Sequence, residues 1–189
     1  LVDTREDIIR TVRHMLATMG RAPMADALIA AQVGRGLRYL VAECLHTDDE
    51  AQIEEGLQRY RVYYKDHMLD HSCLYPDAER VLARFAPQPQ AILTNKSEAS
   101  SRLLLAALGV DRHFQAIVGG DSGFPFKPDP AGLRALLDRF GAPPAGIVGH
   151  AELQPWPDEV RVLFLRLEEL ALGARHVTQA LTRLDDGGR

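Results

Sequence analysis

Cysteine is scarce in this chain, long apolar runs are absent, and neither sign of charge dominates. Cys44 and Cys73 are the only cysteines among 189 residues. Two are too few for a disulfide framework and indicate a reducing compartment, so we expect a cytoplasmic protein. No apolar run approaches the ~20 residues that a membrane-spanning helix needs, so no membrane partner is expected. A formal net charge of -4 argues against nucleic acid or an anionic membrane as the main partner.

The composition that remains is that of an ordinary globular protein. Hydrophobic residues make up 46% of the chain and charged residues 25%, which is typical of a folded domain rather than a disordered segment. The length fits one domain, or one domain with a small insertion. The sequence does not indicate an oligomeric state.

The first 70 residues show almost purely helical patterns. Thr4 and Asp7 resemble a capping box at the start of a helix over 4–19, and Gly20 would end that helix. Thr47 and Glu50 would likewise cap a longer helix that runs to about residue 69. Shorter helical patterns lie between these two, and they cover residues 24–31 and 37–45.

From residue 75 onward, apolar strands alternate with amphipathic helices. This alternation predicts βα units on a parallel sheet, and therefore an α/β fold. The predicted strands cover residues 91–94, 115–118 and 146–148. The predicted helices cover residues 77–85, 97–108 and 130–140. Residues 160–165 fit a strand, although the leucine spacing there fits a helix equally well.

Polar residues follow these strands at the point where each strand ends. Thr94 and Asn95 follow one strand, Lys127 lies in "FKPDP" after the next, and Gly149 follows the third. Ligands usually bind at the carboxyl ends of parallel strands. A hydroxyl, an ammonium and the start of a helix at Ser97 are suitable ligands for a phosphate. Taken singly, Thr94 fits a plain strand-end residue and Lys127 fits a solvated surface lysine.

The order of these motifs resembles the haloacid dehalogenase superfamily, and within it the phosphoglycolate phosphatase group. The motifs are "LVDT" at 1–4, "VGRGL" at 33–37, "ILTNK" at 92–96, "IVGGD" at 117–121, "KPDP" at 127–130 and "IVGH" at 147–150. The resemblance implies a Rossmann-like core with a parallel sheet and a helical cap subdomain. The cap would be residues 4–73, and the core would be residues 74–189 together with 1–3, with the family's first strand missing.

The resemblance also implies roles for individual residues. Thr94 and Asn95 would bind the transferring phosphate, and Lys127 would neutralise its charge; Thr94 and Lys127 would be the catalytic residues. Arg35 would face the organic part of the substrate, although a solvated arginine is an open alternative. Gly34 and Gly36 would let the cap loop approach the site closely. Asp121 fits a turn residue before Gly123.

Two family motifs are missing or altered. The family chemistry uses Mg²⁺ and an aspartyl-phosphate intermediate, and its nucleophile comes from D-x-D-G-T, which this sequence lacks. At the expected Mg²⁺ motif, His150 and Gln154 replace carboxylates and Glu152 stands at a different offset, so no metal ligand is assigned. The match begins at residue 1, which is typical of a truncated chain. A replaced stretch over 150–172 would explain why "GARHVTQALTRL" at 173–184 matches the family again.

These observations leave three functions open. The first is a phosphatase for a small phosphate monoester, similar to phosphoglycolate, of which this chain is an inactive part of marginal stability. The second is a non-catalytic protein that keeps phosphate or partner binding. The third is a structural remnant that dimerises through residues 4–70.

Overall fold

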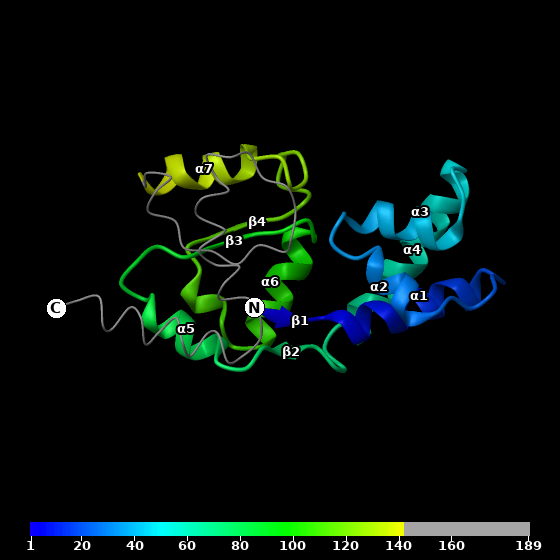
Figure 1. The fold of residues 1–189 in the computed structure, drawn as a ribbon, viewed down its shortest axis with the longest axis horizontal. Helices are drawn as coiled ribbons and strands as arrows, with labels where there is room; N and C mark the ends of the chain where they lie inside the picture. The colour runs from blue at the N-terminus through cyan, green and yellow to red at the C-terminus, as the bar shows by residue number, and fades with distance from the viewer. Residues whose placement is uncertain (142–189) are drawn as a thin grey trace.

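A computed structural model of the protein describes residues 1–141 and shows two lobes side by side (Figure 1). The helical lobe contains α1 (Arg5–Thr18), α2 (Asp26–Ala31), α3 (Leu37–Leu45) and α4 (Glu50–His67). The α/β lobe contains α5 (Ala78–Arg84), β3 (Ala91–Leu93), α6 (Glu98–Ala107), a 3₁₀ turn (Asp111–His113), β4 (Ala116–Val118) and α7 (Ala131–Phe140). The short strands β1 (Val2–Asp3) and β2 (Cys73–Leu74) join the lobes.

The helices of the helical lobe agree with the sequence patterns, but two predicted caps are wrong. The Thr4 side chain makes no capping bond, and the Arg5 N–H donates instead to Asp3 Oδ1 at 3.0 Å. Asp49, not Thr47, caps α4, because its carboxylate accepts from the N–H groups of the first turn. The predicted stop at Gly20 is confirmed: its φ of 66° is the left-handed conformation that favours glycine after a helix.

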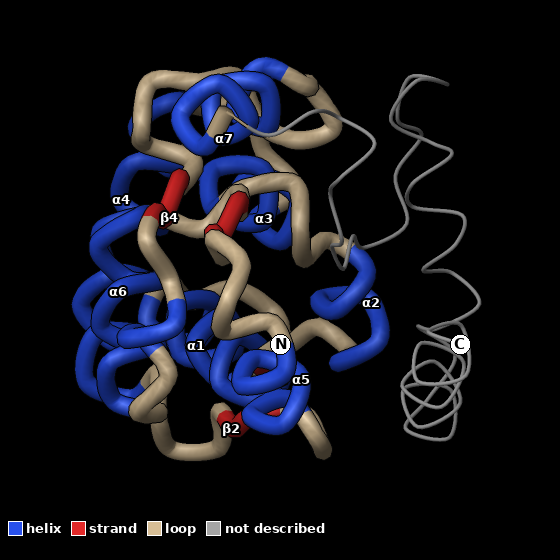
Figure 2. Tube along the Cα trace, turned by 90° about the vertical axis from the view of Figure 1, so that its left-hand side faces the viewer, coloured by secondary structure: helices blue, strands red, loops and turns tan. Residues whose placement is uncertain are grey.

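β3 and β4 form the parallel pair that the alternating pattern predicted. Ala91 lies opposite Ala116, and Leu93 lies opposite Val118. Helix α7 covers one side of this pair and α6 the other (Figures 1 and 2). The Ser97 hydroxyl accepts from the N–H of Ser100 and so caps α6 as expected. The α/β fold is thereby confirmed, while the strands predicted at 146–148 and 160–165 lie outside the described residues.

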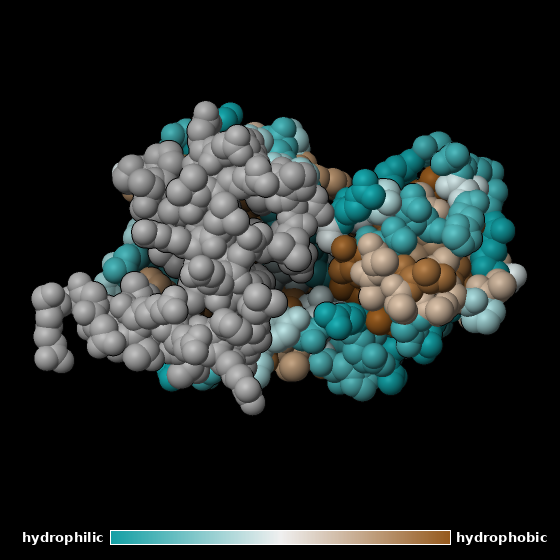
Figure 3. Space-filling model, viewed as in Figure 1, coloured by the Kyte–Doolittle hydropathy of each residue, from teal (hydrophilic) through white to brown (hydrophobic). Residues whose placement is uncertain are grey.

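Each lobe has its own hydrophobic core. The larger cluster lies in the helical lobe and is centred on residues with no more than 1% exposure, such as Val12, Met15 and Val41. The smaller cluster lies in the α/β lobe, around Leu105, Val110 and Ile117. Apolar side chains also gather on the outer surface over α2 (Figure 3), where only Ile29 is buried. The two lobes thus have separate hydrophobic cores.

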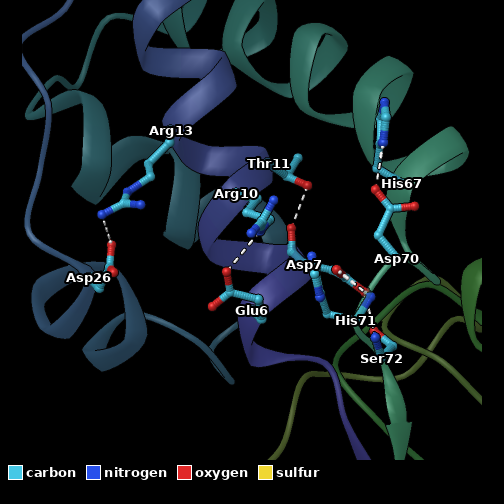
Figure 4. Close-up of polar contacts among 10 residues, drawn as sticks. All are labelled: Glu6, Asp7, Arg10, Thr11, Arg13, Asp26, His67, Asp70, His71 and Ser72. Atoms are coloured by element: carbon cyan, nitrogen blue, oxygen red, sulfur yellow. Dashed lines mark hydrogen bonds and ion pairs between the residues drawn. The ribbon is translucent and has the colours of Figure 1, made fainter.

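A short antiparallel ribbon connects the lobes, with Val2 opposite Leu74 and Asp3 opposite Cys73. Beside it, the buried Asp7 carboxylate of α1 reaches the chain that returns from α4 (Figure 4). It accepts hydrogen bonds from the His71 N–H at 3.0 Å, the Ser72 N–H at 2.8 Å and the Ser72 hydroxyl at 2.6 Å. Asp7 therefore joins the two connections between the lobes rather than capping α1.

No helix within residues 1–141 is both long and apolar enough to span a bilayer.

Candidate functional site

Thr94 stands at the carboxyl end of β3 and is fixed by its neighbours. Its N–H donates to the carbonyl of Val118 at 2.9 Å, which extends the parallel pairing by one bond. Its hydroxyl accepts from the Lys96 N–H at 3.2 Å. The hydroxyl proton remains available as a donor, because this bond uses only an oxygen lone pair.

Asn95 holds three segments together through its side-chain amide. Its Oδ1 accepts from the Lys127 N–H at 2.8 Å, and its Nδ2 donates to the Lys127 carbonyl at 3.2 Å. The same Nδ2 donates to the carbonyl of Gly34 at 2.8 Å. The structure thus brings Lys127 next to the end of β3, as predicted, and attaches the 33–37 loop of the helical lobe to the same point.

Glycines permit the close approach of that loop. Gly36 has a φ of 98°, and a Cβ added there would lie 2.7 Å from the ring of Phe126. A Cβ at Gly120 would lie 2.6 Å from the same ring and 2.6 Å from the Asn95 carbonyl oxygen. The Phe126 ring is thus packed between the loop at Gly36 in the helical lobe and the loop at Gly120 in the α/β lobe, although Phe126 is 45% exposed. Sequence reasoning missed this residue, and its only signal was its place directly before Lys127.

Arg35 lies in the same loop but interacts within the helical lobe. Its guanidinium donates to the Tyr39 hydroxyl and lies 4.0 Å above the centre of the Tyr39 ring. The side chain is exposed. Its described contacts are therefore with the start of α3 and not with Thr94 or Lys127.

Lys96 is a second residue whose importance the sequence did not reveal. Its ammonium donates to the Tyr64 hydroxyl of α4 at 2.7 Å and lies 4.4 Å from the centre of that ring. Burial lowers the pKa of Lys96 to about 8 and raises that of Tyr64 well above its ordinary value. The available signal was the run Thr94-Asn95-Lys96, which places an ammonium directly after a strand end.

The N-terminus of α6 is already occupied by protein groups. Asp121 Oδ1 accepts from the Glu98 N–H at 2.7 Å, so Asp121 caps this helix instead of acting only as a turn residue. The Glu98 carboxylate accepts from the Ser122 hydroxyl at 2.7 Å, and this bond, together with Arg102, lowers the pKa of Glu98. The first N–H group of α6 is consequently not available to a bound anion, contrary to the expectation from the sequence.

The described residues offer no ligand set for Mg²⁺. Across residues 1–141, no group of three or more His, Cys, Asp or Glu side chains could hold a metal ion. The residues at the expected metal motif, His150, Glu152 and Gln154, lie outside the described part of the chain.

Comparison with known proteins decides the family. A model of the haloacid dehalogenase-like hydrolases matches residues 1–148. The chain belongs to this family. It is 32% identical over 155 residues to a phosphoglycolate phosphatase of Neisseria meningitidis and 35% identical over 147 residues to one of Mesorhizobium japonicum. These matches cover 78% and 75% of this chain but 66% and 65% of the relatives, so the chain spans just under two thirds of their length.

Solved structures of the haloacid dehalogenase-like hydrolases share the fold. One is a predicted phosphoglycolate phosphatase of Haemophilus somnus, with a TM-score of 0.74 and 24% identity over 78% of this chain and 70% of that chain. Another is a haloacid dehalogenase-like hydrolase of Bacteroides fragilis, with a TM-score of 0.70 and 27% identity over 76% of this chain and 70% of that chain. The Rossmann-like core and helical insertion expected from the sequence agree with these neighbours.

Proposed function

We propose that the end of β3 is the phosphate-binding edge of a phosphatase site for small phosphate monoesters, similar to that of phosphoglycolate phosphatases. The observation that carries this proposal is the bracing of Lys127 by Asn95 directly after Thr94. This bracing supports the proposal, because the backbone of Lys127 lies beside the end of β3 and open α/β folds bind ligands at strand ends. Membership of the haloacid dehalogenase-like family supports the same chemistry.

Each residue takes a specific part in this proposal. Thr94 donates its hydroxyl proton to a phosphoryl oxygen, and the Lys127 ammonium neutralises the negative charge. Asn95 positions Lys127, because both hydrogen-bonding ends of its amide are used within the protein. Residues 4–73 act as the cap and 74–141, with 1–3, as part of the core. Arg35 of the 33–37 loop would leave Tyr39 and contact the organic part of the substrate.

Hydrolysis in this family needs a carboxylate nucleophile and Mg²⁺, as the resemblance implies. The 189 residues contain no D-x-D sequence, and the described residues hold no Mg²⁺ ligand set. We therefore expect this chain to bind phosphate without turning over a monoester. The missing D-x-D sequence equally favours a second candidate, a non-catalytic phosphate-binding protein, and both share the site at Thr94 and Lys127.

The test is a calorimetric titration with inorganic phosphate, together with an assay of phosphate release from phosphoglycolate and 4-nitrophenyl phosphate with and without Mg²⁺. We expect binding, and about 10- to 100-fold weaker binding in Thr94→Val and in Lys127→Met, the effect of losing one charge-assisted hydrogen bond of ~1.5–3 kcal/mol. Lys65→Met removes an exposed lysine of α4 and serves as the matched control. Equal phosphate affinity in all four proteins would disprove the site. Mg²⁺-dependent turnover would show that another residue serves as the nucleophile.

A further inference from the structure

One polar contact between the lobes is partly buried and lacks a countercharge. Lys96 belongs to the turn after β3, and Tyr64 is a core residue of α4 with 5% exposure. The Lys96 ammonium has the Tyr64 hydroxyl as its hydrogen-bond acceptor and the Tyr64 ring beside it. No ion pair between Lys96 and a carboxylate occurs among residues 1–141. Among residues 1–141, the acidic group that acts electrostatically on Tyr64 is Asp7 of α1.

Such a pair fixes the relative position of the two elements more than it raises the net free energy of unfolding. Taking an ammonium out of water costs free energy, and a single neutral acceptor offsets only part of it. Removing one partner leaves a buried polar group unpaired, whereas removing both leaves an apolar contact that is nearly neutral. The two residues therefore have to remain together, which fixes α4 relative to the end of β3.

The backbone of Lys96 transmits this restraint to the strand ends. Its N–H donates to the Thr94 hydroxyl at 3.2 Å, and its carbonyl accepts from the Gly120 N–H at 2.9 Å. A displacement of Lys96 would thus move the hydroxyl of Thr94 and the loop that follows β4. Lys96 touches α4 with its side chain and Thr94 with its backbone.

We propose that the Lys96–Tyr64 contact is a latch that holds the helical lobe against the strand ends, and that Lys96 is a positioning residue for Thr94. The second part rests on the proposed phosphate site, whereas the first part concerns the two lobes alone. The contact acts by orienting groups, and Lys96 is not assigned a chemical role in the reaction.

A distance measurement between the lobes tests the latch. Spin labels are placed at Val62→Cys on α4 and Leu103→Cys on α6, two positions that are 65% and 56% exposed. Cys73 is exposed and is replaced by serine, whereas Cys44 is buried and stays. Double electron–electron resonance (DEER) then gives the distribution of distances between the two labels. It is recorded for the parent, Tyr64→Phe, Lys96→Met and the double variant. Tyr63→Phe and Lys65→Met are the controls, and circular dichroism confirms that each variant is folded.

We expect one narrow distribution for the parent and both controls. Each single variant should add a longer, broader component, and the double variant should return toward the parent because no buried polar group is left unpaired. Parent-like distances in both single variants would overturn the latch. The latch would also be overturned if the increase in distance in the double variant equalled the sum of the increases in the two single variants. That result would show that the two residues act independently.

Phosphate titration of the same variants tests the positioning part. We expect phosphate affinity to fall about fivefold or more in each open variant and to recover in the double variant, the usual size of a coupling between a conformational change and a ligand. Unchanged affinity in a variant that opens would overturn the positioning role. If the parent binds no inorganic phosphate, the proposed function fails, and the distances alone still decide the latch.

Discussion

Lys96 shows how burial changes the behaviour of a single residue. Lys65, one position after Tyr64 in α4, is exposed. The Lys96 ammonium lies against the Tyr64 hydroxyl and ring instead, and burial lowers its pKa to about 8. A charged group with so little water around it costs stability whenever it is protonated.

The cost of this charge should depend on pH in a defined window. The folded pKa of about 8 lies below the ordinary value of 10.5, so the unfolded chain binds more protons between these values. The free energy of unfolding contributed by Lys96 therefore rises with pH from 8 to 10.5, and the full cost is present below pH 8. In urea unfolding, we expect the free energy of unfolding of the parent, relative to that of Lys96→Met, to increase by about 2 kcal/mol between pH 7 and pH 10. A difference between the two proteins that stays constant over this pH range would mean that Lys96 is not buried in solution.

At the scale of elements, the connection between the lobes depends on Asp7. The β1–β2 ribbon is only two residues long on each side, and short two-stranded pairs are weak alone. The Asp7 carboxylate strengthens it by accepting from both His71 and Ser72, which precede β2. Helix α1 and the return of the chain after α4 are thereby held as one unit.

Replacing Asp7 by asparagine should disrupt that unit. The new amide keeps only one acceptor oxygen, and its NH₂ group would replace the other oxygen and face the His71 N–H, which is a donor too. We expect Asp7→Asn to lower the free energy of unfolding by about 2 kcal/mol or more in chemical denaturation. The matched control is Glu6→Gln, which removes only an exposed pair with Arg10 and should leave the free energy of unfolding almost unchanged. Equal losses in the two variants would contradict the role assigned to Asp7.

At the scale of the whole molecule, three contacts within residues 1–141 join the lobes at the strand ends. They are the Asn95–Gly34 hydrogen bond, the Lys96–Tyr64 contact and the packing of Phe126 against Gly36. All three lie at the strand ends, so the helical lobe is held against the proposed phosphate site. A disturbance at any of them should change the distance between the lobes more than the structure of either core.

Gly36→Ala tests that expectation. The added Cβ would lie 2.7 Å from the Phe126 ring, so the loop has to move away and the radius of gyration from small-angle X-ray scattering should increase. Gly20→Ala is the control, because Gly20 also has positive φ but nothing lies within 4 Å of its Cβ position. Both variants should lose about 1 kcal/mol through backbone strain. Only Gly36→Ala should increase the radius of gyration. An equal radius of gyration in the two variants would show that Phe126 does not hold the lobes together.

The sequence predicted the elements of both lobes well, because their signals are local. Helical spacing gave α3 its full extent, and the alternation after residue 75 gave the parallel pair of β3 and β4. The caps at Thr4 and Thr47 were wrong for one reason: Asp3 and Asp49 stood close by and took over the exposed N–H groups. Which of several neighbouring polar side chains caps a helix depends on backbone geometry that the residue types alone do not fix.

For the site, the sequence by itself determined that Thr94 and Asn95 follow a strand and that Lys127 follows the next one, since parallel strands bring their carboxyl ends to the same edge. It also determined the family through the order of its motifs. Only the tertiary structure decided that Asn95 braces Lys127, that Arg35 turns to Tyr39, and that Lys96 meets Tyr64. The Asn95 and Lys96 contacts join residues 32 positions apart, and the burial that shifts the Lys96 pKa exists only once the two lobes have packed together.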